Sequence, residues 1–285
     1  MQKGIAAIVL ILSVLAVSGC AEQEETRVKD LVIELPDQEE TEATDSQINA
    51  EGDSKQSEEE ENGSFQSVEK KGILISIDPG HQGPQVDMSS QEPNAPGSNV
   101  MKTKATGGTS GRYSGLAEYE LNLDISIQLR EKLEEQGYDV IMTREDNDTA
   151  ISNAERAQLA NEAGADMAIR IHANGSEDPD VNGALVLIGS AENPYVGNLY
   201  DQSCNLGQTI LDAYCEATGM QNLGVQFNDT MTGINWSQIP VIILEMGFMT
   251  NQQDDLNMAD PEYQGKMVEG IVSGINTYCG YSNEN

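Results

Sequence analysis

The most constraining feature of this 285-residue chain is a set of three apolar runs. Each run is followed by a side chain that can bind a metal or carry a proton. They lead to His81, His172 and Glu245, and the chain has no other histidine. Apolar runs this short favour buried strands, and open parallel α/β sheets carry their chemistry at the carboxyl ends of the strands. The sequence therefore predicts a metal site at one edge of such a sheet.

Helical patterns alternate with strand patterns over residues 72–285. One helix is expected over 116–136, with Leu121 and Ile125 on its apolar face and Gly137 as its terminator. Ser152 and Glu155 have the spacing of a capping box for a second helix, reaching about residue 163. The remaining elements are expected as strands 72–78, 138–143, 166–171, 183–188 and 241–245 and as helices 200–218 and 261–278. This order predicts an α/β fold, an open, mostly parallel twisted sheet with helices on both faces and the metal site at the strand carboxyl-terminal ends.

The first 20 residues have the pattern of a targeting sequence. Lys3 precedes an apolar stretch (5–15) that is short for a membrane span, and residues 17–20 resemble a bacterial lipoprotein box. This resemblance implies cleavage before Cys20 and a lipid anchor on its thiol. An ordinary secretory signal or a retained membrane anchor is the alternative.

Residues 21–70 are rich in Glu, Asp, Ser, Gln and Asn, and contribute strongly to the formal net charge of -33. Such a segment buries too little apolar surface to fold, so we expect an acidic, disordered tether with a reach of roughly 40 Å. Residues 72–285 are expected to form the catalytic domain, as a monomer. An acidic chain without a basic patch is a poor ligand for nucleic acid, so no nucleic-acid partner is expected.

Two histidines are too few for a hydrolytic zinc site, which commonly has three protein ligands and one open position. Glu118 lies on the inward face of its helix with Leu121, whereas Glu120 lies on the opposite face. An inward carboxylate is costly unless it is paired or metal-bound, which favours Glu118 as the third zinc ligand. A helix-capping role for Glu118 is the alternative.

Glu245 follows a buried strand and precedes an apolar segment, an environment that raises a carboxyl pKa. A glutamate of this kind can accept a proton from an attacking water molecule and return it to a leaving nitrogen. The alternative is a structural salt bridge with Arg170.

Three further features have open interpretations. The loop 82–115 is long enough to be functional, and we expect it to wall one side of the cleft; a surface insertion is the alternative. Trp236 could stack on substrate, although a single tryptophan beside a core strand more often packs. Cys204 and Cys215 lie about 16 Å apart on one helix, too far for a disulfide, and either could pair with Cys279. We favour three buried thiols.

Four segments carry a family resemblance: IDPGH, EYELNL, the stretch from NAERAQLANEAGAD to RIHANGS, and IPVIILEMGFMTN. In the same order, along nearly all of residues 73–278, they resemble the zinc-dependent N-acetylmuramoyl-L-alanine amidases. By motif position, His81, Glu118 and His172 match the family's zinc ligands, and Glu245 matches its catalytic glutamate.

The resemblance implies a Zn²⁺ enzyme that hydrolyses the amide between the lactyl group of N-acetylmuramic acid and L-alanine in peptidoglycan. With the lipid anchor, it implies a location on the outer face of the bacterial cell membrane. Two alternatives remain: a zinc peptidase with the same site, and a catalytically silent wall-binding lipoprotein, which would be expected to have lost a ligand or Glu245.

Other polar residues in the motifs have less specific roles. Asp78, Asn174 and Arg170 could orient the ligands or could be ordinary strand-end polar groups, whereas Arg156 and Asn161 are interpreted as structural. Gln82 stands where many relatives have glycine, Arg170 where a small residue is common, and the loop after His81 is longer than in the minimal family pattern. These departures leave open which stem peptides and glycans are accepted.

Overall fold

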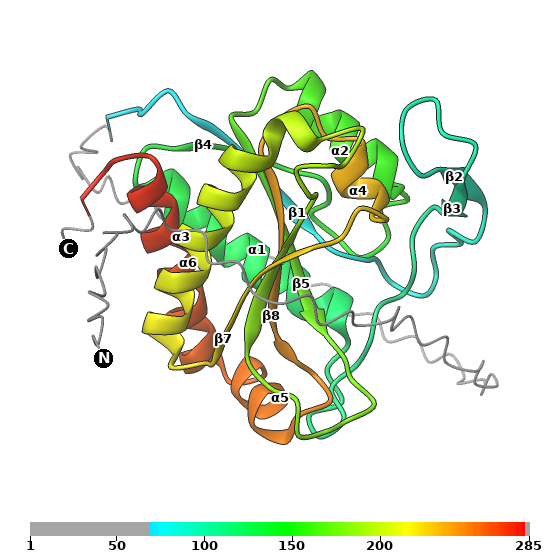
Figure 1. Ribbon diagram of the computed structural model, residues 1–285. Coiled ribbons are helices and arrows are strands. Elements are labelled where there is room, and N and C mark those ends of the chain that lie inside the picture. Colours follow the sequence, from blue (N-terminus) through cyan, green and yellow to red (C-terminus); the bar gives the residue numbers. More distant parts are fainter. Residues whose placement is uncertain (1–68, 283–285) are drawn as a thin grey trace, which may run out of the picture. The chain divides into compact units, whose positions relative to one another are not determined.

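The computed structural model of the protein describes residues 69–282 (Figure 1). The expected leader (1–20), the anchor on Cys20 and nearly all of the expected tether (21–70) lie outside these residues. Within residues 69–282, no helix combines the length and the apolar character that a membrane crossing requires.

A six-stranded sheet runs through the centre of the described residues, in the order β4-β1-β5-β8-β6-β7. All neighbouring strands are parallel except β6 and β8, which are antiparallel. This confirms the expected mostly parallel sheet. The strands are β1 (Leu74–Pro79), β4 (Asp139–Met142), β5 (Met167–Asn174), β6 (Ala184–Ile188), β7 (Asn222–Phe227) and β8 (Val241–Phe248).

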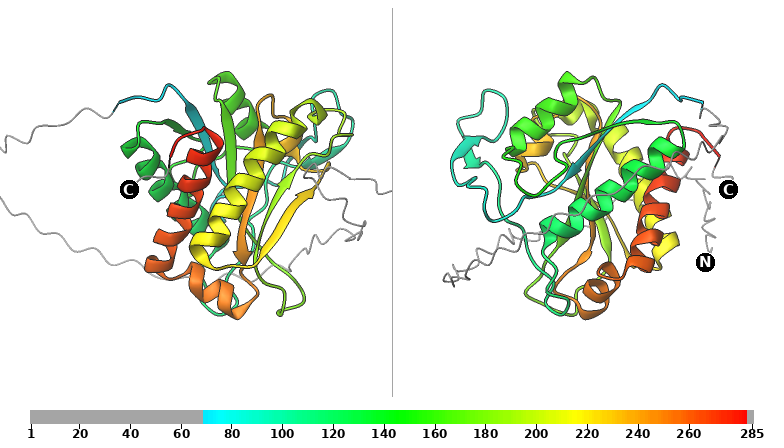
Figure 2. Two further views of the ribbon diagram at one scale, coloured as in Figure 1. Left: turned by 60° about the vertical axis from the view of Figure 1, so that its left-hand side comes forward. Right: turned by 180° about the vertical axis from the view of Figure 1, so that it is seen from behind.

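Helices cover both faces of the sheet, as expected (Figures 1 and 2). Helices α1, α3 and α6 pack together on one face, and α2 and α4 lie on the other. The helices are α1 (Glu118–Glu135), α2 (Asn153–Glu162), α3 (Tyr200–Thr218), α4 (Thr232–Asn235), α5 (Gln252–Met258) and α6 (Pro261–Tyr278), with a 3-10 turn, η1 (Gly197–Leu199).

Each central strand contributes side chains to two hydrophobic clusters, because successive side chains point to opposite faces of the sheet. Ile169 and Ile242 pack in the larger cluster with α1, α3 and α6. Ala168 and Ile243 pack in a smaller cluster with α2 and α4. The strands are therefore apolar on both sides, which explains why they read as continuous apolar runs in the sequence.

Local signals set the helix ends close to the expected positions. The Ser152 hydroxyl accepts from the Glu155 N–H, and the Glu155 carboxylate accepts from the Ser152 N–H, so the expected capping box is present. Helix α1 ends just before Gly137, which has a φ of 87°. A left-handed residue of this kind is the usual end of a helix.

The loop 82–115 contains a short hairpin that the sequence did not predict, β2 (Gln91–Pro93) and β3 (Met101–Thr103). The Ala154 N–H at the start of α2 donates to Glu92 Oε1 at 3.0 Å. The Trp236 indole N–H after α4 donates to the Pro93 carbonyl at 2.9 Å. Trp236 therefore holds this part of the loop against the α2 and α4 layer.

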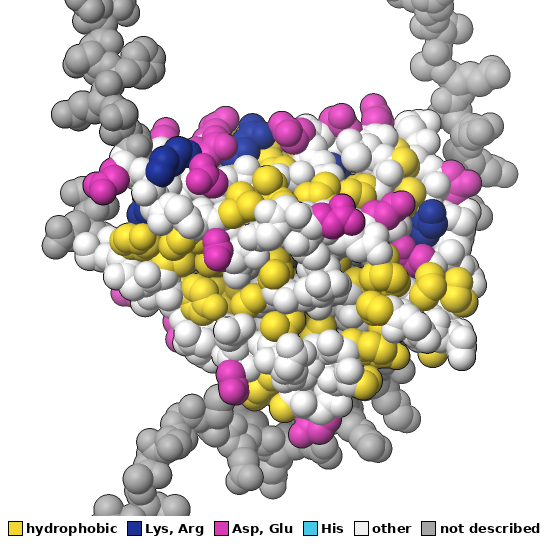
Figure 3. Space-filling model, turned by 90° about the horizontal axis from the view of Figure 1, so that it is seen from above, with side chains coloured by type: hydrophobic (Ala, Val, Ile, Leu, Met, Phe, Trp, Pro, Cys, Tyr) yellow, Lys and Arg dark blue, Asp and Glu magenta, His cyan; other side chains and the backbone are white. Residues whose placement is uncertain are grey.

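Two further features of the fold are the state of its cysteines and the charge of its surface. No disulfide joins the cysteines of the described part of the chain, Cys204, Cys215 and Cys279, which agrees with the expected thiols, but all three are half-buried and not buried as expected. Acidic side chains are spread over the face shown in Figure 3, and no histidine appears on it. An acidic surface repels polyanions and attracts cations.

Candidate metal centre

Three of the four predicted site residues come from the carboxyl-terminal parts of adjacent strands, and the fourth begins a helix. His81 follows β1, His172 lies in β5 and Glu245 lies in β8. The β5 and β8 register pairs His172 with Glu245. Glu118 is the first residue of α1. The order β1-β5-β8 in the sheet therefore explains why residues far apart in the sequence meet here.

The two histidines and Glu118 form a compact cluster. His81 Nε2 lies 3.1 Å from Glu118 Oε1, and His172 Nδ1 lies 3.2 Å from the same oxygen. The centroids of the two imidazole rings are 4.8 Å apart. One potential ligand atom from each residue lies within 4.8 Å of the others, a grouping that could hold a metal ion.

The Glu118 carboxylate is buried, with 3% of the side chain exposed, and is held from outside its own helix. The Thr109 N–H donates to Oε2 at 2.8 Å, and the Ala173 N–H donates to Oε1 at 3.1 Å. Inside α1, the Asn122 amide one turn later donates to Oε1 at 3.3 Å. The position before α1 is Ala117, whose side chain makes no cap, so these contacts support the inward orientation of Glu118 rather than helix capping.

His81 is held in an unusual backbone conformation. Its φ of 61° makes it the only non-glycine residue of the described chain with a positive φ. Its Nδ1 lies 2.7 Å from the Thr106 carbonyl, which can accept the ring N–H and leave Nε2 facing Glu118. A β-carbon on Gly80 would overlap the ring of His172, so only glycine fits directly before His81. Strain of this kind persists only where the surroundings fix it.

The electrostatics of the cluster favour neutral imidazole at His172 and an ionised Glu118. Burial raises the pKa of Glu118, but His81 and His172 outweigh it and hold that pKa well below its ordinary value. Burial lowers the pKa of His172 to about 4. Burial also lowers the pKa of His81, but the Glu118 carboxylate outweighs it and the net shift is upward.

Glu245 is buried beside this cluster and has a different environment. Its Oε2 atom has no hydrogen-bond partner among the described residues. Burial, with a smaller contribution from Glu118, raises its pKa to about 8. The alternative salt bridge to Arg170 is not among the ion pairs of the described residues, because Arg170 pairs with Asp78 instead.

The residues present fit a bound metal. His172 Nε2 and Glu245 Oε2 are both buried without a partner in the described structure, and such groups are costly unless something binds them. Two imidazoles and one carboxylate are a donor set used by hydrolytic zinc sites. The chemistry of the donors therefore agrees with the burial.

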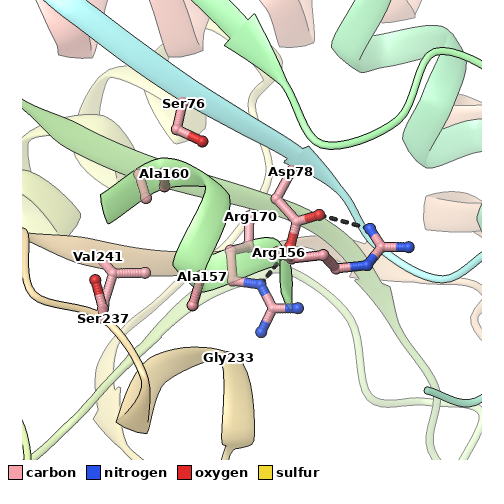
Figure 4. Close-up of a pocket in the computed structure, with 10 residues that line it drawn as sticks. Ser76, Asp78, Arg156, Ala157, Ala160, Arg170, Gly233, Ser237 and Val241 are labelled. Carbon is pink, nitrogen blue, oxygen red and sulfur yellow. Dashed lines mark hydrogen bonds and ion pairs between the residues drawn. The ribbon is translucent and has the colours of Figure 1, made fainter. Parts of the chain in front are cut away.

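Behind the cluster, Asp78 lies between two guanidinium groups (Figure 4). Arg156 Nη1 and Arg170 Nε each lie 2.6 Å from one of its carboxylate oxygens. Arg156 also donates to the His81 carbonyl at 2.8 Å. Arg156 thus contacts the backbone that carries His81, and Asp78 pairs with Arg156.

The two asparagines of the motifs contact backbone groups. Asn174 Oδ1 accepts from the Gly175 N–H at 2.8 Å, a turn contact at the end of β5. The Asn161 side chain bonds the backbone of Trp236 and Gln238, which agrees with its expected structural role.

The sequence interpretation missed Arg144 and Asn122, which both contact the ligand-bearing backbone. Each donates to the carbonyl of Gly80, at 3.0 and 3.3 Å respectively. Asn122 stands four residues after Glu118, a spacing that puts both side chains on one helix face and could have indicated the contact. Arg144 had no such local signal, because its partners next to His81, Pro79 and Gly80, lie 65 and 64 residues away in the sequence.

Comparison with known proteins identifies the same family that the sequence motifs resemble. A family model described as N-acetylmuramoyl-L-alanine amidase matches residues 75–277. The uncharacterized protein YqiI of Bacillus subtilis is 30% identical over 167 residues, which cover 58% of this chain and 76% of that protein. The germination-specific N-acetylmuramoyl-L-alanine amidase of Bacillus subtilis is 26% identical over 227 residues, with 74% and 82% covered. The crystal structure of the amidase Ami1 from Mycobacterium smegmatis is similar with a TM-score of 0.67 and 26% identity, covering 75% of this chain and 99% of that one.

Proposed function

We propose that this chain, which belongs to the N-acetylmuramoyl-L-alanine amidase family, hydrolyses its substrate with the help of a zinc ion. In this mechanism Glu245 transfers the proton. The family match and the amidase structures give the reaction itself, which is cleavage of peptidoglycan at the amide between N-acetylmuramic acid and L-alanine. The proposal concerns the metal and the role of each site residue.

One observation carries the proposal: His81, Glu118 and His172 present ligand atoms within 4.8 Å of one another, next to a carboxyl group without a partner. These three residues would hold the ion. A zinc ion bound there would polarise the substrate carbonyl and lower the pKa of a water molecule.

Glu245 is assigned the proton transfer. Its carboxylate accepts a proton from the water that attacks the lactyl carbonyl carbon, and then gives this proton to the amide nitrogen as the carbon–nitrogen bond breaks. The products are a lactyl carboxylate and a stem peptide with a free L-alanine amino group. Burial raises the Glu245 pKa, which makes its carboxylate a stronger base towards the proton of the attacking water.

The direct test is digestion of purified peptidoglycan by the protein with and without a chelator. New L-alanine amino termini that vanish with the chelator and return with Zn²⁺ are expected. A zinc peptidase would instead release amino termini of other stem residues, and a silent wall-binding protein would release none.

The ligand assignment has its own test in the metal content of His81→Ala and His172→Ala proteins. Each change removes one of three ligands, so zinc occupancy should fall strongly in both. Full zinc occupancy in both variants would contradict the assignment.

We further propose that the protein works outside the cytoplasm, because its substrate is the cell wall. The expected lipid on Cys20 and the tether (21–70) would hold the catalytic residues at the outer face of the cell membrane. Metabolic labelling with a fatty acid, compared between the natural chain and Cys20→Ala, tests this attachment. Equal labelling of both proteins would contradict it.

A further inference from the structure

The turn after β4 buries an arginine that no carboxylate neutralises by direct contact. Arg144 is 2% exposed and takes part in no ion pair of the described residues. Burial, with a smaller effect of Arg156, lowers its pKa to about 10, so it still carries its charge at neutral pH. Burying such a cation is costly unless every donor finds an acceptor.

All five N–H donors of Arg144 find an oxygen acceptor. Nε donates to the Pro79 carbonyl at 2.9 Å, and Nη2 donates to the Gly80 carbonyl at 3.0 Å. Nη2 also donates to the Tyr119 carbonyl at 2.7 Å. The remaining two bonds go from Nη1 to the Asp146 carbonyl and to Asn147 Oδ1, each at 3.0 Å. An arginine has five N–H donors in one rigid plane, and here every one of them has an acceptor.

Three of the five acceptors belong to the two segments that carry His81 and Glu118. Pro79 and Gly80 directly precede His81, and Tyr119 directly follows Glu118. One planar group therefore fixes the backbone of β1's end relative to the first turn of α1. Because a guanidinium has a fixed shape, it sets the separation of these two segments.

The backbone at residues 79–81 also lies against the third predicted ligand. A β-carbon on Gly80 would overlap the His172 ring, so this backbone and that ring are in tight contact. From the other side, Arg156 donates to the carbonyls of Pro79 and His81 at 2.7 and 2.8 Å. A shift of this segment would therefore change the position of His81 relative to both Glu118 and His172.

From this geometry we propose that Arg144 is a positioning residue of the metal centre: its guanidinium ties the Pro79–Gly80 backbone to the Tyr119 carbonyl and so holds His81 at ligand distance from Glu118. The inference rests on the proposed zinc site. It assigns a role in metal binding to a residue that contacts neither the metal ligands' side chains nor Glu245.

The test is Arg144→Lys in the full-length protein. Lysine keeps the positive charge but has one ammonium group in place of the planar fork, so it cannot reach acceptors in three separate segments. The dissociation constant for Zn²⁺ should rise by about 10 to 100 times, the usual effect of losing a contact that orients a ligand. The visible absorption spectrum of the Co²⁺-loaded protein, which reports ligand geometry, should also change.

Two controls separate positioning from loss of stability. Arg130→Lys makes the same substitution at a half-buried arginine whose partner is Glu145, and should leave Zn²⁺ affinity unchanged. Tyr138→Phe removes a buried hydrogen bond to Asn276 just before β4, at the opposite end of the β1 and β4 pair from His81. It should lower the melting temperature without changing the Co²⁺ spectrum.

Arg144→Gln is made in parallel, because it also removes the buried charge and keeps a planar amide. It should show the same direction of change in Zn²⁺ affinity. Wild-type affinity and spectrum in a folded Arg144 variant would overturn the inference, as would an equal loss in Tyr138→Phe. Failure of both Arg144 variants to fold would also overturn it, since Arg144 would then serve the fold. If the wild-type protein itself bound no metal, the proposed zinc mechanism would fail instead.

Discussion

At the scale of single residues, two carboxyl groups at one edge of the sheet have opposite surroundings. Glu118 accepts from two backbone N–H groups and faces two imidazoles, which favour its charged form. Glu245 has an oxygen without a partner and a pKa raised to about 8. Separate environments of this kind are how a protein gives two similar side chains different roles, here a metal ligand and a proton carrier.

The two roles predict different failures when each carboxylate becomes an amide. Glu245→Gln keeps the shape of the side chain but cannot accept a proton, so zinc content should persist while turnover falls by roughly two to four orders of magnitude. Glu118→Gln replaces an anionic ligand with a neutral one, so metal binding itself should weaken. Zinc content and amide hydrolysis are measured on both proteins side by side. Loss of zinc in Glu245→Gln, or near-normal activity, would contradict the role given to Glu245.

A second prediction concerns Asp78 and the stability of the fold. Burial raises its pKa, but Arg156 and Arg170 outweigh burial and hold the pKa well below its ordinary value. Asp78→Asn leaves two buried guanidiniums without their carboxylate and should cost about 3–5 kcal/mol of unfolding free energy near pH 7.

The same pKa shift gives the pH dependence its sign. The unfolded chain binds more protons at this residue than the folded one, so the contribution of Asp78 is full above about pH 4 and is lost as the pH falls towards the folded-state pKa. Urea unfolding of the wild-type and Asp78→Asn proteins between pH 3 and pH 7 should show a stability difference that narrows below pH 4. A constant difference across that range would rule out this account.

The four candidate site residues could be brought to one edge of the sheet from the sequence, because each lies at the start or the end of a strongly patterned element. It did not predict Arg144 or the contact of Arg156 with His81, because these depend on how distant segments pack. Arg144 lies in a polar turn that looks like any other turn, and its burial becomes visible only once β1 and β4 lie side by side.

At the scale of elements, segments with a clear apolar pattern were predictable, short strands included, whereas β7, α4 and α5 were not. The helix expected over 261–278 has those bounds in the structure, and Asp260 caps it as Pro261 begins it. Strand β7 is exposed at the sheet edge and is interrupted by Gly224, which has a φ of 81°. A strand of this kind has neither an apolar run nor alternation for the sequence to show.

The capping box of α2 gives a prediction at this scale. Ser152 is fully buried, so no water replaces its hydroxyl when it is removed. Ser152→Ala should lower the unfolding free energy by about 1 kcal/mol, because the Glu155 N–H loses its acceptor. Chemical unfolding measures the loss, with the exposed Thr230→Ala as a control that should stay within about 0.5 kcal/mol of wild type. Wild-type stability in Ser152→Ala would mean that the box contributes little.

At the scale of the whole molecule, the sequence predicted a mostly parallel sheet with the candidate site at the carboxyl ends of its strands. It did not predict the complete strand order. The antiparallel pairing of β6 with β8 was not predictable, since the pattern of an apolar strand is the same in both directions. That pairing places Leu185 beside Glu245 on the side opposite His172. An apolar neighbour there contributes to the dry surroundings that raise the Glu245 pKa.

The last prediction concerns the proposed tether, residues 21–70, and separates stability from reach. Within the described part of this segment, Lys70 pairs with Asp139, and both side chains are more than half exposed. An exposed pair contributes at most about 1 kcal/mol, so deleting residues 21–70 should shift the melting temperature by less than about 4 °C and leave hydrolysis of soluble fragments unchanged. Digestion of the wall in cells should fall, because the catalytic residues would be held too close to the membrane. A Gly/Ser linker of equal length should restore digestion if reach is what matters, whereas failure to restore it would point to the acidic composition. A large drop in melting temperature would show instead that residues 21–70 pack against the folded part of the chain that carries the catalytic residues.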